Sequence, residues 1–258
     1  MLEVDAAEIT SWIGRYMWPF FRISACLMAM PVIGTQLIPG RIKIALAFLI
    51  TIVIGPLIPE VPHVEGISLE AALIAGQQLL IGVAMGFSLQ FLFQLFVVGG
   101  QMIAMQMGMG FASIVDPANG VSVTVLSQLF LILVTLLFLS MNGHGVLIEV
   151  LVESFYTLPI GVDGLGAEGF HKLAMQGVWM LGSAVLIALP AVTSILVVNL
   201  TFGVMTRAAP QLNIFAIGFP MTMTLGLVVT WITSAGILSQ YHQFSQQSLS
   251  FLRSLVGA

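Results

Sequence analysis

Two long stretches of this chain carry no formal charge. Residues 71–115 and 208–252 contain no Asp, Glu, Lys or Arg. A helix that crosses the hydrocarbon core of a bilayer needs about 20 apolar residues, so each stretch is long enough for a full crossing. A charged side chain at the bilayer centre costs about 2.5–3.5 kcal/mol on insertion scales, and this cost explains such depletion. The sequence therefore predicts a membrane protein.

The composition supports this class and excludes others. The chain is 59% hydrophobic and only 7% charged, whereas a soluble domain is about 25% charged. The net charge of −4 is small and scattered, so nucleic acid is not an expected partner. Cys26 is the only cysteine, which leaves no internal disulfide. The N-terminus is acidic, so we expect no cleaved signal peptide.

Six apolar segments are predicted to be helical, because open strands leave backbone groups unpaired in lipid. They cover residues 12–33, 44–58, 71–100, 121–141, 174–204 and 212–240. The second is shorter than a crossing requires, and the third and fifth are longer, which fits tilted or partly embedded helices. Pro190 and Pro220 should bend their segments without ending them. We expect an all-α membrane protein with a mostly acidic linker at 142–172.

Basic residues give a prediction of orientation. Arg41 and Lys43 lie in the first linker and Arg207 in the last turn. The positive-inside rule then places the turns at 34–43 and 205–211 in the cytoplasm. Six crossings would put both termini outside and the linker at 107–120 inside.

The segment from Gln106 to Gly120 combines loop residues with apolar ones. It holds three glycines, an Asp-Pro and an Asn-Gly, which favour turns. An exposed loop would be polar, yet this one carries Met109, Phe111, Ile114 and Val115. One interpretation is a re-entrant loop that is buried in protein or lines a cavity. The other is an interfacial connector that dips its apolar residues into the headgroups. Four methionines between 102 and 109 suit a deformable seal, although core packing is the usual role of methionine.

Two arginines lie in the first apolar segment. Arg15 and Arg22 are seven residues apart, so they share nearly the same helical face. Arg15 can extend to the interface, whereas Arg22 lies deeper and needs a carbonyl or a carboxylate partner inside an assembly. We interpret both as buried intramembrane or intersubunit charges with a structural role, and a role in transport is the alternative.

The sequence contains no convincing catalytic, cofactor or metal site. Glu149 and Glu153 are four residues apart and follow His144, a spacing that would suit a proton relay or a metal. No further His or Cys completes a ligand set, so a solvated helix face is the better interpretation. No nucleophile elbow, phosphate loop or dinucleotide fingerprint is present. We therefore expect no enzyme and no cofactor.

Four motifs follow one another along the chain: Met107-Gly-Met-Gly-Phe-Ala-Ser-Ile-Val-Asp-Pro117, Phe138-Leu-Ser-Met-Asn-Gly-His144, Phe155-Tyr-Thr-Leu-Pro-Ile-Gly161 and the stretch from Thr206 to Pro220. Together they resemble the FliR/SctT family of type III secretion export-gate subunits. Tyr16–Arg22 and Ile38–Lys43 also fit, so the resemblance covers essentially the whole chain. The stretch Gly110–Pro117 follows the flagellar form of the family rather than the injectisome form. Gly110 precedes Phe111 where most flagellar relatives have another residue, which should loosen the loop.

The resemblance implies a non-enzymatic subunit of the flagellar export gate. Such subunits assemble with FliP and FliQ into a closed channel for unfolded flagellar proteins, in contact with FlhB and with FlhA. It implies a FliP-like helical region at 1–172 and a FliQ-like hairpin at 173–258. It also implies a place in the bacterial inner membrane at the flagellar basal body, with part of the assembly raised towards the periplasm.

The resemblance also implies roles for particular residues. The segment at about 107–120 corresponds to the plug that obstructs the passage. The plug residues are Gly108, Met109, Gly110, Phe111, Ile114, Val115, Asp116 and Pro117. The turn with Arg207, Pro210 and Gln211 corresponds to a partner contact on the cytoplasmic side.

Three other functions are kept open. A small-solute secondary transporter would need polar groups at the membrane midplane, and Arg22, Pro190 and Pro220 are the features that favour it. The equivalent SctT subunit of a virulence injectisome would share nearly every motif. A structural scaffold without a gate would share every feature except the loop.

Overall fold

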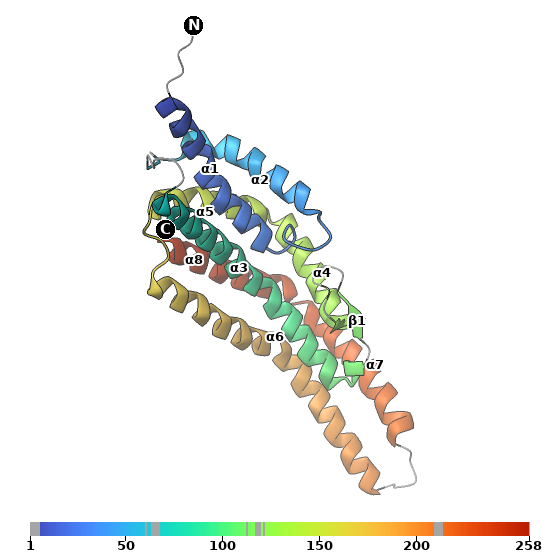
Figure 1. Cartoon of the computed structure of the whole chain (residues 1–258). Coiled ribbons are helices and arrows are strands. Elements are labelled where there is room, and N and C mark those ends of the chain that lie inside the picture. Colours follow the sequence, from blue (N-terminus) through green and yellow to red (C-terminus); the bar gives the residue numbers. More distant parts are fainter. Residues whose placement is uncertain are drawn as a thin grey trace. The chain divides into compact units, whose positions relative to one another are not determined.

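The computed structural model describes residues 6–59, 61–62, 68–111, 113–116, 120, 122–208 and 214–257. These residues are almost entirely helical, which confirms the all-α membrane fold (Figure 1). The helices are α1 (Ala6–Ala29), α2 (Gly40–Ile54), α3 (Leu69–Gln106), α4 (Val125–Ser140), α5 (Gly143–Thr157), α6 (Ala167–Ala208), α7 (Ile214–Ser234) and α8 (Ile237–Val256). Two short 3₁₀ turns, η1 (Gly55–Leu57) and η2 (Met109–Phe111), and two short strands, β1 (Ser113–Val115) and β2 (Ser122–Thr124), complete the order.

The helix lengths agree with the uneven apolar segments. Helix α2 has 15 residues, whereas α3 has 38 and α6 has 42. Pro190 and Pro220 lie inside α6 and α7 and do not end them. Within the described part of the chain, three helices are long and apolar enough to cross a membrane, and two interrupted helix pairs raise this number to five. Helix α1, which carries Arg15 and Arg22, is not among the three.

Three elements differ from the sequence prediction. The predicted linker at 142–172 contains α5, whose buried residues Leu147, Leu151 and Phe155 repeat at helical spacing. The segment predicted as helical from residue 121 begins instead with β2, and α4 starts only at Val125. Helix α8 extends well beyond the predicted end at residue 240, because an apolar stripe alternates there with serine and glutamine.

The chain divides into two compact units. The first comprises Met1–Phe91, Met141–Gly177 and Gln247–Ala258. In this unit α1 and α2 lie side by side, and α1 also packs closely on α3 (Figure 1). Gly82 of α3 permits this approach, because a Cβ at this position would collide with the carbonyl oxygen of Arg22. Ser88 and Gln176 exchange two buried hydrogen bonds of 2.7 and 3.1 Å, which link α3 to the start of α6.

The second unit comprises Leu92–Ser140 and Val178–Gln246. Its core is aromatic: Phe96 lies 6.2 Å from Tyr241 and 6.3 Å from Phe244 between ring centroids, and Phe93 lies 5.4 Å from Phe138. Such pairs favour tilted and edge-to-face geometry. Two glycines of α3 admit the neighbouring helices, since a Cβ at Gly99 would meet Ile187 of α6 and one at Gly100 would meet Phe130 of α4.

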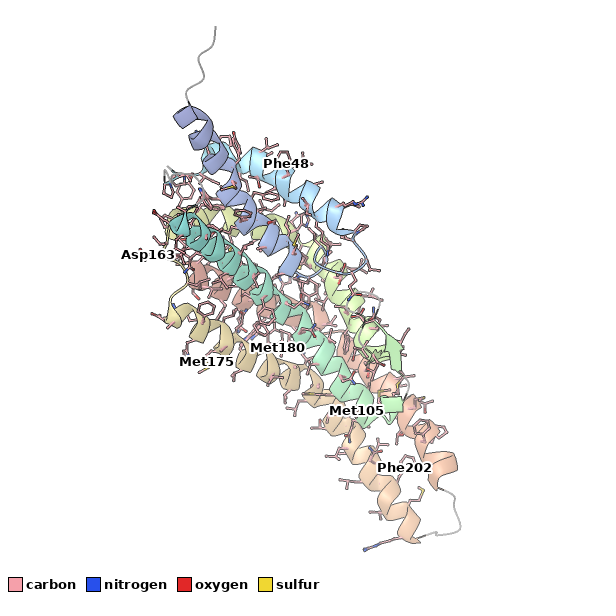
Figure 2. The ribbon with its side chains drawn as sticks, in the orientation of Figure 1. Phe48, Met105, Asp163, Met175, Met180 and Phe202 are labelled. Carbon is pink, nitrogen blue, oxygen red and sulfur yellow. The ribbon has the colours of Figure 1, made fainter. Side chains whose placement is uncertain are left out.

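Many large apolar side chains point outwards. Phe48 on α2 is 55% exposed, and Val204 on α6 and Trp231 on α7 are 70% and 77% exposed (Figure 2 labels Phe48). A soluble protein rarely leaves so much apolar surface in contact with water. Lipid or partner subunits must therefore cover these helices.

Candidate gate segment and polar clusters

The predicted loop is a short hairpin between α3 and α4. We call residues 107–124 the gate segment. Helix α3 ends because Gly108 takes a positive φ of 79°, a conformation that side chains disfavour. Strands β1 and β2 then pair antiparallel, with Ile114 opposite Val123. The segment thus contains ordered structure that the sequence did not predict.

The individual plug residues lie in different surroundings. Gly108 and Met109 are half-buried, Gly110 is exposed, and Ile114 is 46% exposed. Asp116 is buried, and its carbonyl oxygen accepts a 2.8 Å hydrogen bond from the N–H of Gly120. The backbones of Phe111 and Val115 belong to η2 and β1, and Pro117 lies outside the described residues. The apolar side chain of Ile114, in the middle of β1, is therefore accessible, whereas Asp116 is not.

The start of the gate segment rests on α7. Met107 is fully buried, and its sulfur lies 3.0 Å from the position that a Cβ would take on Gly226. The ring of Phe219 lies 2.9 Å from the Cβ position of Gly108. Each contact requires a glycine on one side, because a Cβ there would collide with the neighbouring side chain. The packing here is therefore tight, and the side chains that make it are apolar.

The end of the gate segment rests on α3 through polar groups. Gln101 Oε1 accepts hydrogen bonds from the backbone N–H of Thr124 (3.2 Å) and from the hydroxyl of Ser127 (2.9 Å). Thr124 Oγ1 in turn accepts the N–H of Ser127 at 3.3 Å, which is an N-cap of α4. Sequence reasoning missed this cluster. A glutamine near the end of an apolar helix, followed by a threonine and a serine at the next helix start, was the available signal.

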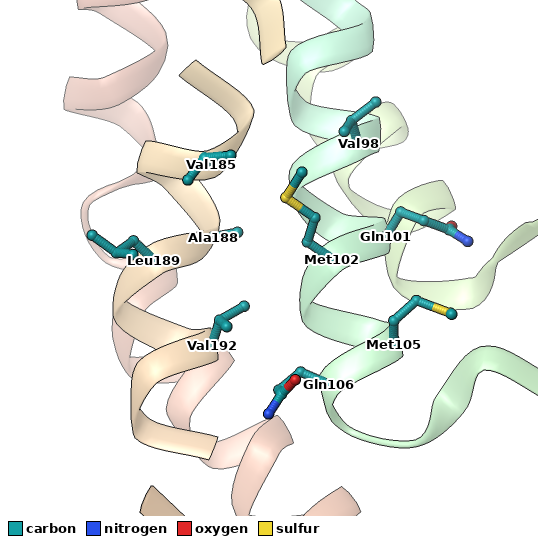
Figure 3. A pocket seen from close by; sticks show the side chains of 9 residues that line it. All are labelled: Val98, Gln101, Met102, Met105, Gln106, Val185, Ala188, Leu189 and Val192. Carbon is teal, nitrogen blue, oxygen red and sulfur yellow. The ribbon is translucent and has the colours of Figure 1, made fainter. Parts of the chain in front are cut away.

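An open groove of about 600 Å³ lies beside this cluster, within the same unit (Figure 3). Met102 lies between α3 and α6, while Gln101 points from α3 away from α6 (Figure 3). The lining residues are Val98, Gln101, Met102, Met105, Gln106, Val185, Ala188, Leu189 and Val192. The lining has no formal charge. It offers no acid–base or nucleophilic group.

Arg22 lies at the centre of a second polar cluster, in the first unit. Its Nε donates to Gln78 Oε1 (2.8 Å), one terminal nitrogen donates to the carbonyl of Ser154 (2.7 Å), and the other donates to the carbonyl of Leu158 (2.8 Å). The guanidinium also lies 4.3 Å from the centre of the Phe155 ring, a cation–π distance. Arg22 is completely buried, whereas Arg15 is exposed. The cluster joins α1, α3 and the end of α5.

Of the remaining candidate residues, those that the structure describes are partly or largely exposed. Glu149 and Glu153 of α5 form ion pairs with Arg253 of α8, at 3.4 and 3.3 Å. Arg207 is exposed in the last turn of α6, where a cation is favoured by the helix dipole. Pro210 and Gln211 lie outside the described residues. In the described part of the chain, no three of His, Cys, Asp and Glu gather as metal ligands.

Comparison with known proteins defines the class. The family model described as bacterial export proteins, family 1, matches residues 13–248. The chain is 41% identical to the flagellar biosynthetic protein FliR of Escherichia coli K12, over 88% of this chain and 87% of that protein. It is 32% identical to FliR of Aquifex aeolicus, over 81% of each chain, and 25% identical to FliR of Bacillus subtilis, over 94% of each.

The chain therefore belongs to family 1 of the bacterial export proteins. This is a family of export-apparatus components and not of enzymes.

Proposed function

We propose that this chain is a subunit of the flagellar type III export gate, and that its gate segment plugs the passage for unfolded export substrates. The flagellar assignment is supported by the relatives reported above, which carry the name flagellar biosynthetic protein FliR. The plug is supported by one observation above others: a hairpin whose first strand carries the exposed apolar side chain of Ile114 lies between two apolar helices.

The chemistry of the gate segment suits a seal. Ions cross apolar surfaces poorly, so aliphatic and thioether side chains can block a narrow passage. A contact made mostly by dispersion is weak for each atom pair, so an arriving polypeptide can displace it without breaking strong bonds. Gly108 and Gly110 supply a backbone that can follow such a displacement.

The exposed apolar helices suit assembly with other membrane subunits. We propose FliP and FliQ as the partners that cover them, with residues 1–172 as the FliP-like region and 173–258 as the FliQ-like hairpin. The turn at Arg207, Pro210 and Gln211 is the proposed contact for FlhB, with FlhA as a further neighbour. The assembly is placed in the bacterial inner membrane, partly raised towards the periplasm.

A small-solute transporter is less well supported. Such a protein needs an accessible polar or charged group at depth. Arg22 is completely buried, and its partners among the described residues are all neutral groups of the same unit. The guanidinium of Arg22 therefore has no accessible face on which a solute could bind. Purification of the chain alone as a stable, solute-binding monomer would nevertheless favour the transporter.

Deletion of residues 108–117 tests the plug. The variant should assemble normally with its partners, and the expressed complex should conduct small ions. Ion conductance of purified complexes in planar bilayers is the measurement. A replacement of the same ten residues by glycine and serine is the matched control for loop length, and it should also leak because the apolar tips are gone. Normal assembly with unchanged conductance would reject the plug and favour a scaffold.

A further inference from the structure

The two ends of the gate segment are held by different kinds of contact. At its start, Met107 and Gly108 touch Gly226 and Phe219 through apolar atoms only. At its end, the backbone N–H of Thr124 donates to Gln101 Oε1, and the hydroxyl of Thr124 accepts the N–H of Ser127. Dispersion contacts are tolerant of small shifts, whereas hydrogen bonds are directional. The return strand is therefore fixed in position more strictly than the outgoing one.

The polar end forms a closed network. The hydroxyl of Ser127 donates to Gln101 Oε1, so its oxygen remains free to accept. The hydroxyl of Thr124 lies 2.8 Å from that oxygen and completes the chain of donors. Thr124 and Ser127 are 1% and 0% exposed, whereas Gln101 is half-buried and lines the open groove. The two hydroxyls are therefore shielded from water, and a network whose members satisfy one another holds one geometry and makes a half-broken state costly.

Close packing of α3 on α4 makes the network possible. A Cβ at Gly100 would lie 3.0 Å from the Cα of Ser127 and 2.6 Å from the ring of Phe130. Glycine at this position therefore lets α4 approach α3 closely enough for the neighbouring Gln101 to reach both the strand and the helix start. The amide is neutral, so breaking its hydrogen bonds leaves no bare charge in an apolar region.

We propose that Gln101 is the positioning residue of the gate: a latch that holds the return strand β2, and with it the hairpin, in the closed position. This inference rests on the proposed function of the gate segment as a plug. Release of Thr124 and Ser127 from Gln101 frees β2 from α3. The hairpin then moves about Gly108, whose N–H donates to the carbonyl of Met105 at the end of α3 (3.1 Å) and whose contact with α7 among the described residues is the apolar one with Phe219.

The substitution Gln101→Leu tests the latch in the assembled complex. Leucine keeps much of the side-chain volume and removes the acceptor. We expect at least about a tenfold increase in ion leakage, since the net stability of the two hydrogen bonds that Gln101 Oε1 accepts is lost. The rate at which a thiol reagent labels a cysteine placed by Ile114→Cys should rise by a similar factor. The change Gln128→Leu is the matched control, because Gln128 Oε1 is buried on α4 and has no partner among the described residues.

Two substitutions at Ser127 separate a latch from a general defect. Ser127→Ala removes one donor and should give a smaller rise in leakage and labelling. Ser127→Thr retains the hydroxyl and should restore values close to those of the unaltered protein. If Gln101→Leu fails to assemble, the Ser127→Ala complex decides in its place.

The outcomes distinguish the latch from the plug. Leakage after Gln101→Leu or Ser127→Ala, with normal subunit composition, supports the latch. A sealed complex with either change, beside a leaking complex that lacks residues 108–117, overturns the latch and leaves the plug intact. A sealed complex after that deletion overturns the plug itself.

Discussion

The two polar clusters of the molecule differ in charge and in what they hold. In the first unit, Arg22 places a full charge among carbonyls and an amide and ties three helices together. In the second unit, Gln101 uses a neutral amide to hold one strand and one helix start. A buried charge that loses its partners is far more costly than a buried amide that loses its own. The first cluster therefore suits a permanent structure, and the second suits a part that moves.

The largest effect should come from Arg22→Met. Methionine removes the donors and leaves the carbonyl of Leu158 and Oε1 of Gln78 without them, whereas the carbonyl of Ser154 keeps its 3.0 Å hydrogen bond from the N–H of Leu158. At about 1–3 kcal/mol for each unsatisfied group, the total loss should be at least about 2 kcal/mol. Thermal unfolding of the detergent-solubilised complex measures it.

Two further changes calibrate this result. Arg22→Lys keeps the charge but not the planar fork, so an intermediate loss is expected. Arg15→Met alters an exposed arginine on the same helix and should change the unfolding temperature little. Equal effects at positions 15 and 22 would contradict the structural role of the Arg22 cluster.

A smaller effect is expected from Thr124→Val, which removes the N-cap of α4 and one member of the latch network. Loss of such a cap costs about 1 kcal/mol. Thr135→Val is the matched control, because the hydroxyl of Thr135 donates to the carbonyl of Leu131 within the same helix, and among the described residues it has no other hydrogen-bond partner. The unfolding temperature and the ion leakage of each variant complex should be measured and compared with those of the unaltered complex. If only the Thr124→Val complex leaks, the Gln101 cluster controls a part that moves, as the comparison with the Arg22 cluster requires. If the Thr124→Val and Thr135→Val complexes leak equally, that distinction between the two clusters no longer holds.

The smallest effect should come from Arg253→Gln. This change breaks the ion pairs with Glu149 and Glu153, whose side chains are 60% and 37% exposed. Exposed pairs contribute about 0–1 kcal/mol, and salt screens them. The difference in unfolding temperature from the unaltered protein should thus shrink when the measurement is repeated in about 1 M salt. A difference that persists in high salt would mean that Arg253 acts through packing.

The helices could be predicted from charge depletion and from the places of proline and glycine, because lipid permits few other structures. The end of α3 near Gly108 and the turn before Gly120 were indicated by glycine. The two strands of the gate segment were not indicated by the sequence, because each has only three residues, too few to reveal an alternating pattern. Helix α8 was missed by a search for apolar runs, although Tyr241, Phe244 and Leu252 follow helical spacing.

The polar clusters show where sequence reasoning stops. The depth of Arg22 predicted a need for an oxygen partner, but Gln78 is 56 residues away and Ser154 is 132 residues away. The choice of partner depends on the packing of α1 against α3, which Gly82 permits. Gln101 likewise gains its role only when Gly100 brings α4 close. Single residues at long range carry no periodic signal, so these contacts required the structure.

The central claim is that the gate segment lies in the path of the exported chain, and crosslinking to a stalled substrate tests it most directly. Single cysteines should be introduced by Met109→Cys and Ile114→Cys in a Cys26→Ala background, with Val178→Cys on α6 as the exposed control, 65% accessible in the isolated chain. The account predicts substrate adducts at positions 109 and 114 and none at 178. Adducts at 178 alone, or none at 109 and 114 while the substrate is demonstrably stalled in the complex, would contradict it.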